Sequence, residues 1–366
     1  MELLGNHTDY NRGLVLSAAI DRYTCVAAAR CPSLGEVRVW SENLAAADRF
    51  PLEGIAALPR GSWSNYVRGV GAALVEAGDS PGGFDAAIVS EVPLGGGLSS
   101  SASLECAVAM AVLALAGHPF DQQSDGMKLA ERLRAAEHEF AGVQCGVLDQ
   151  FSCVFGKKDH ALFLDCDALA HETVSFGSLT PAIVVCDSRT PHELARGKYN
   201  ERRTECDDAV DSLRRRYSAT IGSLRDVPYE SFLACQVGMK SVLARRARHV
   251  LTENQRVQAG VELLRRSGDL HAFGQLMLES HQSSRDNFEN SSPELDCLVE
   301  IARSLPGFRG AKLSGAGWGG CTVNLVHPAQ AEFFARRLVE EFSARVGLPA
   351  SALLCNPAPG ARAVRA

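Results

Sequence analysis

The chain has 366 residues, of which 46% are hydrophobic and 22% charged, and this composition excludes disorder on a large scale. The length is enough for two domains that each bury a core. The net charge of −6 argues against a nucleic-acid-binding protein, and the sequence has no apolar stretch of membrane-spanning length free of charges and glycines.

The 12 cysteines are scattered singly, and the sequence contains no Cys-x-x-Cys pair or Cys/His metal-ligand spacing. Such cysteines are typical of reduced, buried thiols in a cytosolic protein. The start of the chain also lacks the basic and apolar pattern of a signal peptide. We therefore expect a cytoplasmic protein that binds neither nucleic acid nor a membrane, and we expect it to be a monomer.

A dense polar cluster opens the chain, Gly5-Asn6-His7-Thr8-Asp9-Tyr10-Asn11, and strand-like runs follow at 13–20 and 23–29. Asn6, Asp9 and Asn11 are good turn formers, so a tight turn is one interpretation of the cluster. A binding site is the other interpretation, because an amide, an imidazole and a carboxylate within four residues can surround the hydroxyls of a small polyol.

A strand is predicted at 37–41, and the run at 63–74 has the spacing of a helix. Trp63 and Tyr66 lie three residues apart in this run, so they share one face of the helix. They either stack on a base or pack in the core, and core packing is the commoner role of such pairs.

A segment rich in glycine and serine, Pro93 to Leu104, joins a predicted strand at 85–92 to a predicted buried helix at 104–116. Glycines let amide N–H groups converge on one point, while serines and a helix start add further donors. The donor residues are Gly95, Gly96, Gly97, Ser99, Ser100 and Ser101. The segment lacks the lysine of a P-loop and the last glycine of G-x-G-x-x-G. It therefore indicates a phosphate site of another class, or else a flexible loop that caps a core helix.

Two carboxylates follow this segment. Glu137 lies near the end of a charged amphipathic helix predicted at 128–140, and Asp149 interrupts the apolar stretch at 146–152. A carboxylate among apolar neighbours is costly unless it is paired or used, although Asp149 could also cap a helix.

The rest of the chain completes an α+β pattern. The predicted elements are strands at 160–165 and 182–187, helices at 198–206 and 229–278, and a second glycine loop at 312–321 before a strand at 322–326.

Three segments resemble, in order, the three motifs of the GHMP small-molecule kinase superfamily, and within it they are most similar to the galactokinase family. The segments are Gly5–Asn11, which is similar to the signature G-E-H-T-D-Y-N, then Pro93–Ser103 and Lys312–Cys321. Agreement continues between the motifs, and the matching segments are Ala136–His138, Cys145–Gln150, Tyr199–Arg203, Arg246–Val250, Ser280–His281 and Ser292–Asp296. The resemblance covers nearly the whole chain.

The resemblance implies an α+β, two-domain GHMP-kinase-like fold, with mixed β-sheets packed with helices and an active site in the cleft between the domains. The expected domains are 1–155, with the phosphate-binding loop, and 156–366, with the option that the last strand returns to the N-terminal domain. The implied reaction is transfer of the γ-phosphoryl group of ATP to the anomeric hydroxyl of D-galactose. Such a reaction asks the protein mainly to position the reactants and to neutralise developing charge.

The resemblance also implies the roles of individual residues. Asp149 matches the catalytic carboxylate, and Ser101 with Glu137 is expected to hold Mg²⁺. The expected sugar-binding residues are Asn6, His7, Asp9 and Tyr199, and the expected nucleotide-binding residues are Gly95, Gly96, Gly97, Ser99, Ser100, Ser101 and Trp63. The glycines at 315–320 would help to close the cleft, or would form only a tight turn.

Two departures from the family pattern bear on activity. The family carries a catalytic arginine just before the position of Met1, and we expect an in-frame extension of the chain to supply it. Asn6 stands where the family usually has a glutamate that contacts the sugar, which keeps hydrogen bonding but removes a charge. The alternatives to galactose phosphorylation are therefore a kinase for galacturonate or N-acetylgalactosamine, or a catalytically impaired sugar sensor.

Overall fold

The computed structural model describes residues 1–31, 35–94, 97–177, 180–190, 195–266 and 268–364. These residues form two compact units, each assembled from segments that are separate in the sequence. The first unit contains residues 1–18, 97–98 and 157–358, and the second contains 19–94, 99–156 and 359–364. The predicted division of the chain at residue 155 stays a prediction.

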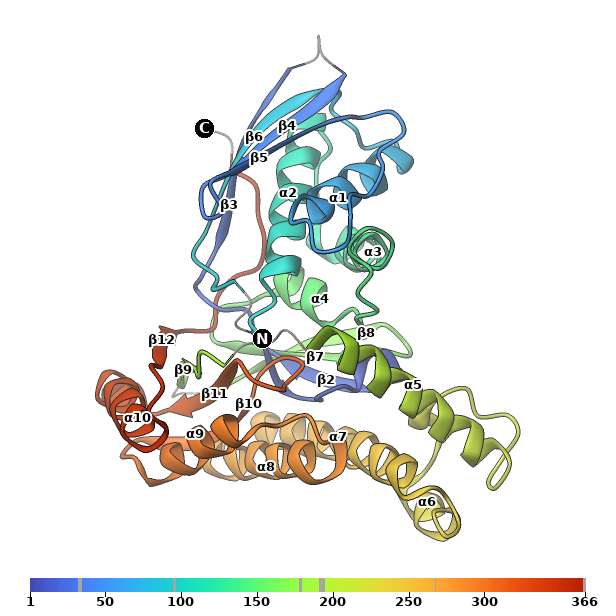
Figure 1. The fold of residues 1–366 in the computed structure, drawn as a ribbon, viewed down its shortest axis with the longest axis vertical. Helices are drawn as coiled ribbons and strands as arrows, with labels where there is room; N and C mark the ends of the chain where they lie inside the picture. The colour runs from blue at the N-terminus through green and yellow to red at the C-terminus, as the bar shows by residue number, and fades with distance from the viewer. Residues whose placement is uncertain (32–34, 95–96, 178–179, 191–194, 267, 365–366) are drawn as a thin grey trace. The chain divides into compact units, whose positions relative to one another are not determined.

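The first unit contains two four-stranded antiparallel sheets, visible in the lower half of Figure 1. One sheet has the order β1-β2-β7-β8 and the other the order β10-β11-β9-β12. Their bounds are Glu2–Leu4 (β1), Leu14–Ser17 (β2), His160–Asp165 (β7), Ala170–Ser175 (β8), Ala182–Asp187 (β9), Phe308–Leu313 (β10), Cys321–Val326 (β11) and Ser351–Cys355 (β12). The central strands β9 and β11 are buried almost throughout, which agrees with the apolar sequence of β9, whereas β11 also buries Thr322 and Asn324 among its apolar residues.

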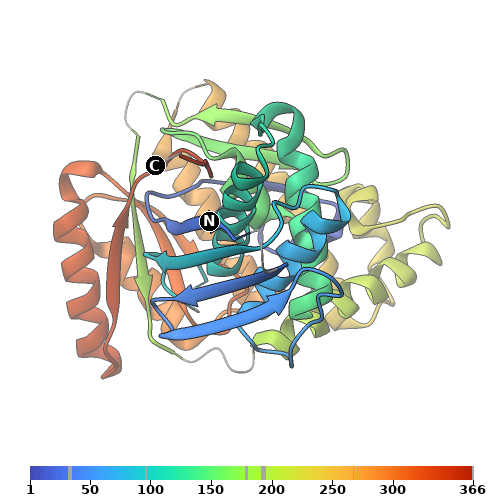
Figure 2. The same cartoon turned by 90° about the horizontal axis from the view of Figure 1, so that it is seen from above.

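Long helices pack on these sheets. Their bounds are Ala195–Arg214 (α5), Tyr229–Cys235 (α6), Ser241–Arg266 (α7), Leu270–Ser283 (α8), Pro293–Ser304 (α9) and Ala331–Val346 (α10), with short turns at Asp9–Asn11 (η1), Leu224–Asp226 (η3), Ser284–Phe288 (η4) and Pro328–Gln330 (η5). Helix α8 packs closely on β10, while α10 lies along β9 and β12, as Figure 2 also shows. One apolar core fills the space between α9, α10 and the second sheet, and another joins α5 to α7.

The second unit contains one sheet with the order β3-β6-β4-β5, in which only the β4–β6 pair is parallel among the described strands. Helices cover one side of this sheet (Figures 1 and 2), with α2 packed on β3. The bounds are Thr24–Arg30 (β3), Glu36–Ser41 (β4), Ala46–Pro51 (β5), Phe84–Ser90 (β6), Ser64–Glu76 (α1), Ser100–Ala116 (α2), Gln122–Ala136 (α3), Glu137–Ala141 (η2) and Leu148–Phe155 (α4).

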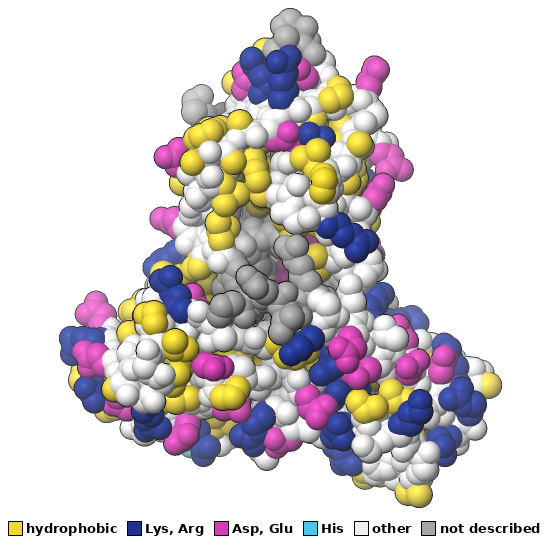
Figure 3. All heavy atoms as spheres, in the orientation of Figure 1, with side chains coloured by type: hydrophobic (Ala, Val, Ile, Leu, Met, Phe, Trp, Pro, Cys, Tyr) yellow, Lys and Arg dark blue, Asp and Glu magenta, His cyan; other side chains and the backbone are white. Residues whose placement is uncertain are grey.

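Charged side chains of both signs are mixed over the face drawn in Figure 3, along the helices of the first unit in particular. Within the described part of the chain, the helices are too short or too polar to cross a membrane.

Candidate functional site

The glycine- and serine-rich segment ends in helix α2, which begins at Ser100 and not near Leu104 as the sequence predicted. The difference arises because serines are tolerated in the first turn of a helix, whereas the prediction followed the apolar residues alone. Ser99 precedes the helix with a left-handed backbone and no capping hydrogen bond from its side chain. The first N–H groups of α2 therefore lack a side-chain cap, which is the condition under which a helix start binds an anion.

The predicted phosphate-binding glycines are only partly visible. Gly95 and Gly96 lie outside the described residues. Gly97 has a φ of +68°, which favours glycine, and its carbonyl accepts a hydrogen bond from Ser314 Oγ at 3.2 Å. A Cβ at Gly97 would stand 2.9 Å from the carbonyl oxygen of Ser314, so the close approach of the two glycine-rich loops requires glycine here.

Glu137 lies in a cluster of polar groups in the second unit. Gln150 Nε2 donates to Glu137 Oε2 at 2.7 Å and to Glu105 Oε2 at 3.0 Å, and Cys145 Sγ lies 3.4 Å from Glu137 Oε2. Ser101 also forms a side-chain hydrogen bond with Glu137. Burial, and then the charge of Asp149, raises the pKa of Glu137. Burial and the charge of Glu137 raise the pKa of Glu105 well above its usual range.

Asp149 is the second residue of α4, half-buried in the first turn of this helix. The residue at the cap position is Val147, and no side chain caps the helix. The interpretation of Asp149 as a helix cap is therefore wrong.

The donor set at Ser101 and Glu137 fits Mg²⁺. Both residues offer oxygen, and the oxygen atoms Glu105 Oε1 and Gln150 Oε1 are buried nearby in the same cluster without a hydrogen-bond partner among the described residues. Like charges at Glu137 and Asp149 would be relieved by a divalent cation. The described residues contain no group of three or more His, Cys, Asp or Glu side chains placed to hold a metal. Mg²⁺ needs no such group, because it usually keeps waters and substrate phosphates as ligands beside one or two protein oxygens.

Trp63 and Tyr66 lie at the start of α1 and are both half-buried, whereas Val67, Val70 and Leu74 form the buried face of this helix. The two aromatic side chains are therefore less buried than the core face of this helix. Their proposed contact with a base stays a prediction.

The polar cluster at the start of the chain forms a tight turn, as one of its two interpretations predicts. Gly5 has a φ of +103°, and the Thr8 hydroxyl donates to the carbonyls of Gly5 and Leu14 at 2.7 and 2.6 Å. Gly13 N–H closes the turn on the carbonyl of Thr8 at 2.8 Å. The turn does not exclude a binding site, because it leaves the side chains of His7 and neighbouring residues to be placed by tertiary contacts.

His7 is buried among aromatic rings. Its ring centroid lies 5.2 Å from that of Tyr199 and 4.6 Å from that of Phe288. Nε2 donates to the carbonyl of Ala316 at 3.0 Å, so Nδ1 accepts from the Tyr10 hydroxyl at 2.9 Å. Burial lowers the pKa of His7 to about 3, and the imidazole is therefore neutral at physiological pH.

The structure brings three of the predicted sugar-binding positions to one region. Asp9 lies in the short turn η1, where its carboxylate accepts the N–H of Tyr10 at 3.0 Å. Tyr199 comes from α5, and its ring lies 5.4 Å from that of Tyr10. His7 lies between these elements. Sequence reasoning missed Tyr10 as a neighbour of the site, although the residue lies within the first motif.

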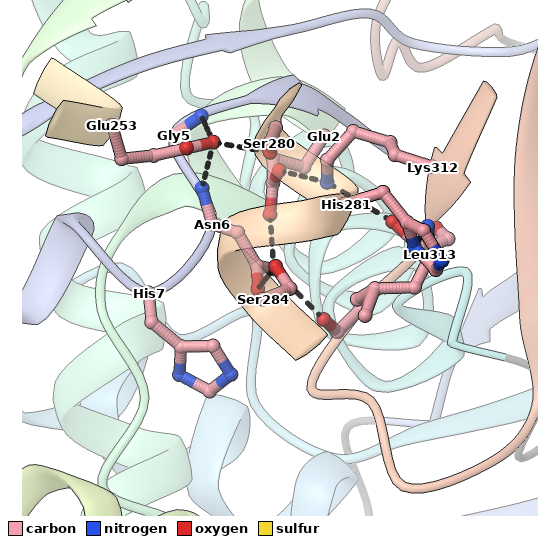
Figure 4. A network of polar contacts seen from close by, with 12 residues as sticks. Glu2, Gly5, Asn6, His7, Glu253, Ser280, His281, Ser284, Lys312 and Leu313 are labelled. Carbon is pink, nitrogen blue, oxygen red and sulfur yellow. Dashed lines mark hydrogen bonds and ion pairs between the residues drawn. The ribbon is translucent and has the colours of Figure 1, made fainter. Parts of the chain in front are cut away.

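Asn6 is held by a buried polar network, which Figure 4 shows together with Glu2, Glu253 and Lys312. Glu253 Oε1 accepts the N–H groups of Gly5 and Asn6 at 3.0 and 3.2 Å. Although burial raises it, the pKa of Glu253 falls to about 2 because nearby cationic groups stabilise the carboxylate. Sequence reasoning missed Glu2, Glu253 and Lys312, and no periodic signal connects residues so far apart in the chain.

Comparisons with known proteins match these segments. Family models match residues 1–30 as the galactokinase galactose-binding signature, 65–157 as the N-terminal domain of GHMP kinases and 261–344 as the C-terminal domain of GHMP kinases. The galactokinase of Roseiflexus sp. (strain RS-1) is 44% identical over 360 residues, which are 98% of this chain and 90% of that relative. The galactokinase of Chloroflexus aurantiacus is 40% identical over 371 residues, 100% of this chain and 92% of that relative.

Comparison with solved structures supports the same family. The Lactococcus lactis galactokinase complexed with galactose superposes with a TM-score of 0.90 at 34% identity, covering 98% of this chain and 92% of that one. A mevalonate kinase shares the fold, with a TM-score of 0.65 at 18% identity over 97% of this chain and 96% of that one. The fold and the matched models define a small-molecule kinase of the GHMP class with the predicted two-domain α+β architecture. Within this class, the chain belongs to the galactokinase family.

Proposed function

We propose that the chain transfers the γ-phosphoryl group of ATP to the anomeric hydroxyl of D-galactose and forms galactose 1-phosphate. The observation that carries this proposal is the full-length match to galactokinases, including a relative whose structure contains galactose. The family signature for galactose binding matches residues 1–30, where the tight turn places His7 and Asp9.

The proposed roles follow from the chemistry of each group. Asp149 removes or orients the proton of the anomeric hydroxyl, and it lies half-buried in the first turn of α4. His7, Asp9 and Tyr199 are the proposed sugar contacts, whereas the predicted contact of Asn6 with the sugar is not part of the proposal, because the Asn6 amide is bonded within the protein. The neutral imidazole of His7 suits an uncharged polyol better than a charged ligand.

The phosphates of ATP are expected at the serine-rich start of α2. Gly95, Gly96, Gly97, Ser99, Ser100 and Ser101 are the proposed phosphate contacts, and Trp63 is the proposed neighbour of the adenine. Ser101 and Glu137 would hold Mg²⁺, whose bound charge neutralises the phosphates. Gln150 orients the Glu137 carboxylate through its 2.7 Å hydrogen bond.

The test of the proposal is Asp149→Asn. We expect this variant to lose turnover of galactose and ATP, measured by ADP release and by detection of galactose 1-phosphate, while binding of galactose persists in calorimetry. Asp125→Asn is the matched control, because Asp125 also lies in the first turn of a helix in the same unit. Near-normal turnover by Asp149→Asn would contradict the proposed role of the carboxylate.

The choice among sugars is a separate question. Galactose, galacturonate, N-acetylgalactosamine and arabinose should be compared by kcat/KM, and we expect galactose to be preferred. A preference for galacturonate would show instead that the amide of Asn6 admits a charged sugar. Binding of ATP and galactose without product would favour a sensor. The cytoplasmic location and the monomeric state stay predictions.

A further inference from the structure

The Asn6 side chain uses its whole hydrogen-bonding capacity within the protein. Its Nδ2 donates to Glu2 Oε2 at 2.8 Å and to the carbonyl of Gly315 at 3.1 Å. Its Oδ1 accepts from Ser284 Oγ at 3.2 Å and from Asn290 Nδ2 at 3.0 Å. A carboxamide has two donors and an oxygen with two lone pairs, so all four positions are filled. The side chain is only 1% exposed.

The orientation of this amide is fixed by its neighbours. Glu2 Oε1 accepts from Lys312 Nζ at 2.5 Å, and both side chains are buried. Burial raises the pKa of Glu2, whereas Lys312 and Asn6 favour its ionised form. An ionised Glu2 and the Gly315 carbonyl can only accept hydrogen bonds, so they require the N–H side of Asn6.

The partners of Asn6 lead directly to the second glycine loop, residues 314–320. Asn6 holds the carbonyl of Gly315, while His7 Nε2 and Asn290 Nδ2 both donate to the next carbonyl, that of Ala316, at 3.0 Å each. Two consecutive carbonyls of this loop are thus held by side chains of Asn6, His7 and Asn290. The carbonyl that Asn6 holds thus directly precedes the acceptor that fixes the tautomer of His7.

We propose that Asn6 is a positioning residue, and that the pair it forms with Glu2 fixes the second glycine loop and, through Ala316, the imidazole of His7. Its effect on turnover rests on the proposed function, because His7 is a proposed sugar contact. Glu2 is the second member of the device, since its carboxylate selects the orientation of the Asn6 amide. The carboxylate and the amide are complementary, so exchanging the two chemical groups should preserve the pair.

The experiment is a double-mutant cycle of Asn6→Asp and Glu2→Gln. Asn6→Asp alone places a carboxylate against Glu2 and against the Gly315 carbonyl, and Glu2→Gln alone leaves the buried Lys312 without its counter-charge. The double variant again contains one amide, one carboxylate and one ammonium group. Asn324→Asp is the matched control, because Asn324 is a buried asparagine of the same unit whose Nδ2 donates to the Val184 carbonyl at 2.9 Å.

We expect each single variant at Glu2 and Asn6 to raise the KM for galactose by about tenfold or more, which corresponds to about 1.4 kcal/mol, with little change in the KM for ATP. The double variant should have a KM clearly below the product of the two single effects but above the wild-type KM, because the amide at position 2 can again donate to the carboxylate at position 6, whereas the Gly315 carbonyl still faces a carboxylate. Asn324→Asp should lower Tm without changing the KM for galactose. A purely structural role would instead lower Tm in all variants and leave KM unchanged.

Two results would overturn the inference. In the first, the double variant performs no better than the product of the two single effects. In the second, Asn6→Asp abolishes discrimination against a single deoxygalactose while leaving the others unaffected, which is the signature of a direct sugar contact. A positioning residue should weaken galactose and its deoxy analogues in parallel.

A readout without any sugar separates this inference from the proposed function. Amide hydrogen exchange at 314–320 should accelerate in Asn6→Asp, return toward the wild-type rate in the double variant and stay unchanged in Asn324→Asp. If the wild-type chain fails to phosphorylate galactose but this exchange pattern holds, only the proposed function fails. If exchange in Asn6→Asp equals that of the wild type, the positioning role fails.

Discussion

Acidification from pH 7 to pH 5 should weaken the fold through buried neutral histidines, and His249 is the best one to test. It is fully buried in α7, where Nε2 donates to the carbonyl of Asn6 at 2.9 Å and Nδ1 lies 3.0 Å from Ser283 Oγ. Burial lowers its pKa to about 4, with Glu253 acting in the opposite direction and Arg256 in the same direction.

The sign and size of the effect follow from proton linkage. In the unfolded chain His249 recovers its ordinary pKa of about 6.5 and takes up about 0.7 of a proton between pH 7 and 5, whereas the folded form stays mostly neutral. The stabilisation present above pH 6.5 is therefore lost as the pH falls toward 4, and the loss between pH 7 and 5 is about 2 kcal/mol. His7, with a pKa of about 3, adds a similar loss.

Buried carboxyls oppose this effect in the same pH range. The pKa values of Glu2, Glu105 and Glu137 are raised, so these groups favour the folded state as the pH falls. The wild-type curve alone is therefore not diagnostic. The difference between the wild type and His249→Gln isolates one histidine, because glutamine retains a donor for the Asn6 carbonyl and does not titrate.

The assay is urea unfolding of the wild type and His249→Gln at pH 7, 6 and 5. Whatever the difference in unfolding free energy at pH 7, we expect the variant to gain about 2 kcal/mol on the wild type by pH 5. Parallel curves for the two proteins across this range would refute the reasoning, since they would mean that His249 binds protons equally in the folded and unfolded chains.

Three further predictions concern packing, a buried charge and the metal. Gly274→Ala should prevent the formation of soluble folded protein, because a Cβ would stand 1.5 Å from the carbonyl oxygen of Arg309. Circular dichroism and gel filtration would measure this loss, and normal folding would contradict the packing of α8 on β10. Arg246→Met should cost about 1–3 kcal/mol in urea unfolding, since it removes the buried guanidinium that pairs with Glu205 and Glu289 while each carboxylate keeps a second arginine, and a loss below about 0.5 kcal/mol would argue against this pairing. Glu137→Gln should raise the Mg²⁺ concentration for half-maximal turnover by about tenfold or more, and it should weaken the binding of Mg²⁺ with nucleotide in calorimetry. The control variant Glu139→Gln, at an exposed position, should change neither quantity. Equal effects of the two variants would exclude Glu137 as a ligand of Mg²⁺.

Periodicity and turn signals predicted most elements of the fold. The apolar run at 182–187 is β9, and the run at 322–326 becomes β11 with one residue added before it. The hydrophobic pattern predicts the start of α2 four residues too late, because Ser100 and Ser101 carry no hydrophobic signal. Serine is nevertheless compatible with the first turn of a helix. The order of strands within the sheets depends on pairings between distant segments, which local patterns do not encode.

The candidate site was predictable to a different degree. Asp149 could be identified as a carboxylate in an apolar stretch, but its place in the first turn of α4 required the structure. The contact between His7 and Tyr199 joins residues from the first and the second half of the chain, and only the family resemblance connected them beforehand. The Glu2–Lys312 pair had no signal at all, because a charged residue within a three-residue strand suggests an exposed edge and not a buried ion pair.

The two interpretations of the opening segment, a tight turn and a binding site, are parts of one device. His7 has a φ of 59°, a left-handed conformation that costs a non-glycine residue about 1 kcal/mol or more. The left-handed backbone of His7 persists because hydrogen bonds hold both nitrogens of its ring and because a buried polar network holds the preceding residue, Asn6. A residue chosen for the turn alone would avoid this cost, as glycine does. The left-handed backbone at His7 supports the proposed function of its side chain, and the Asn6–Glu2 pair is the part of the fold that we propose to sustain it.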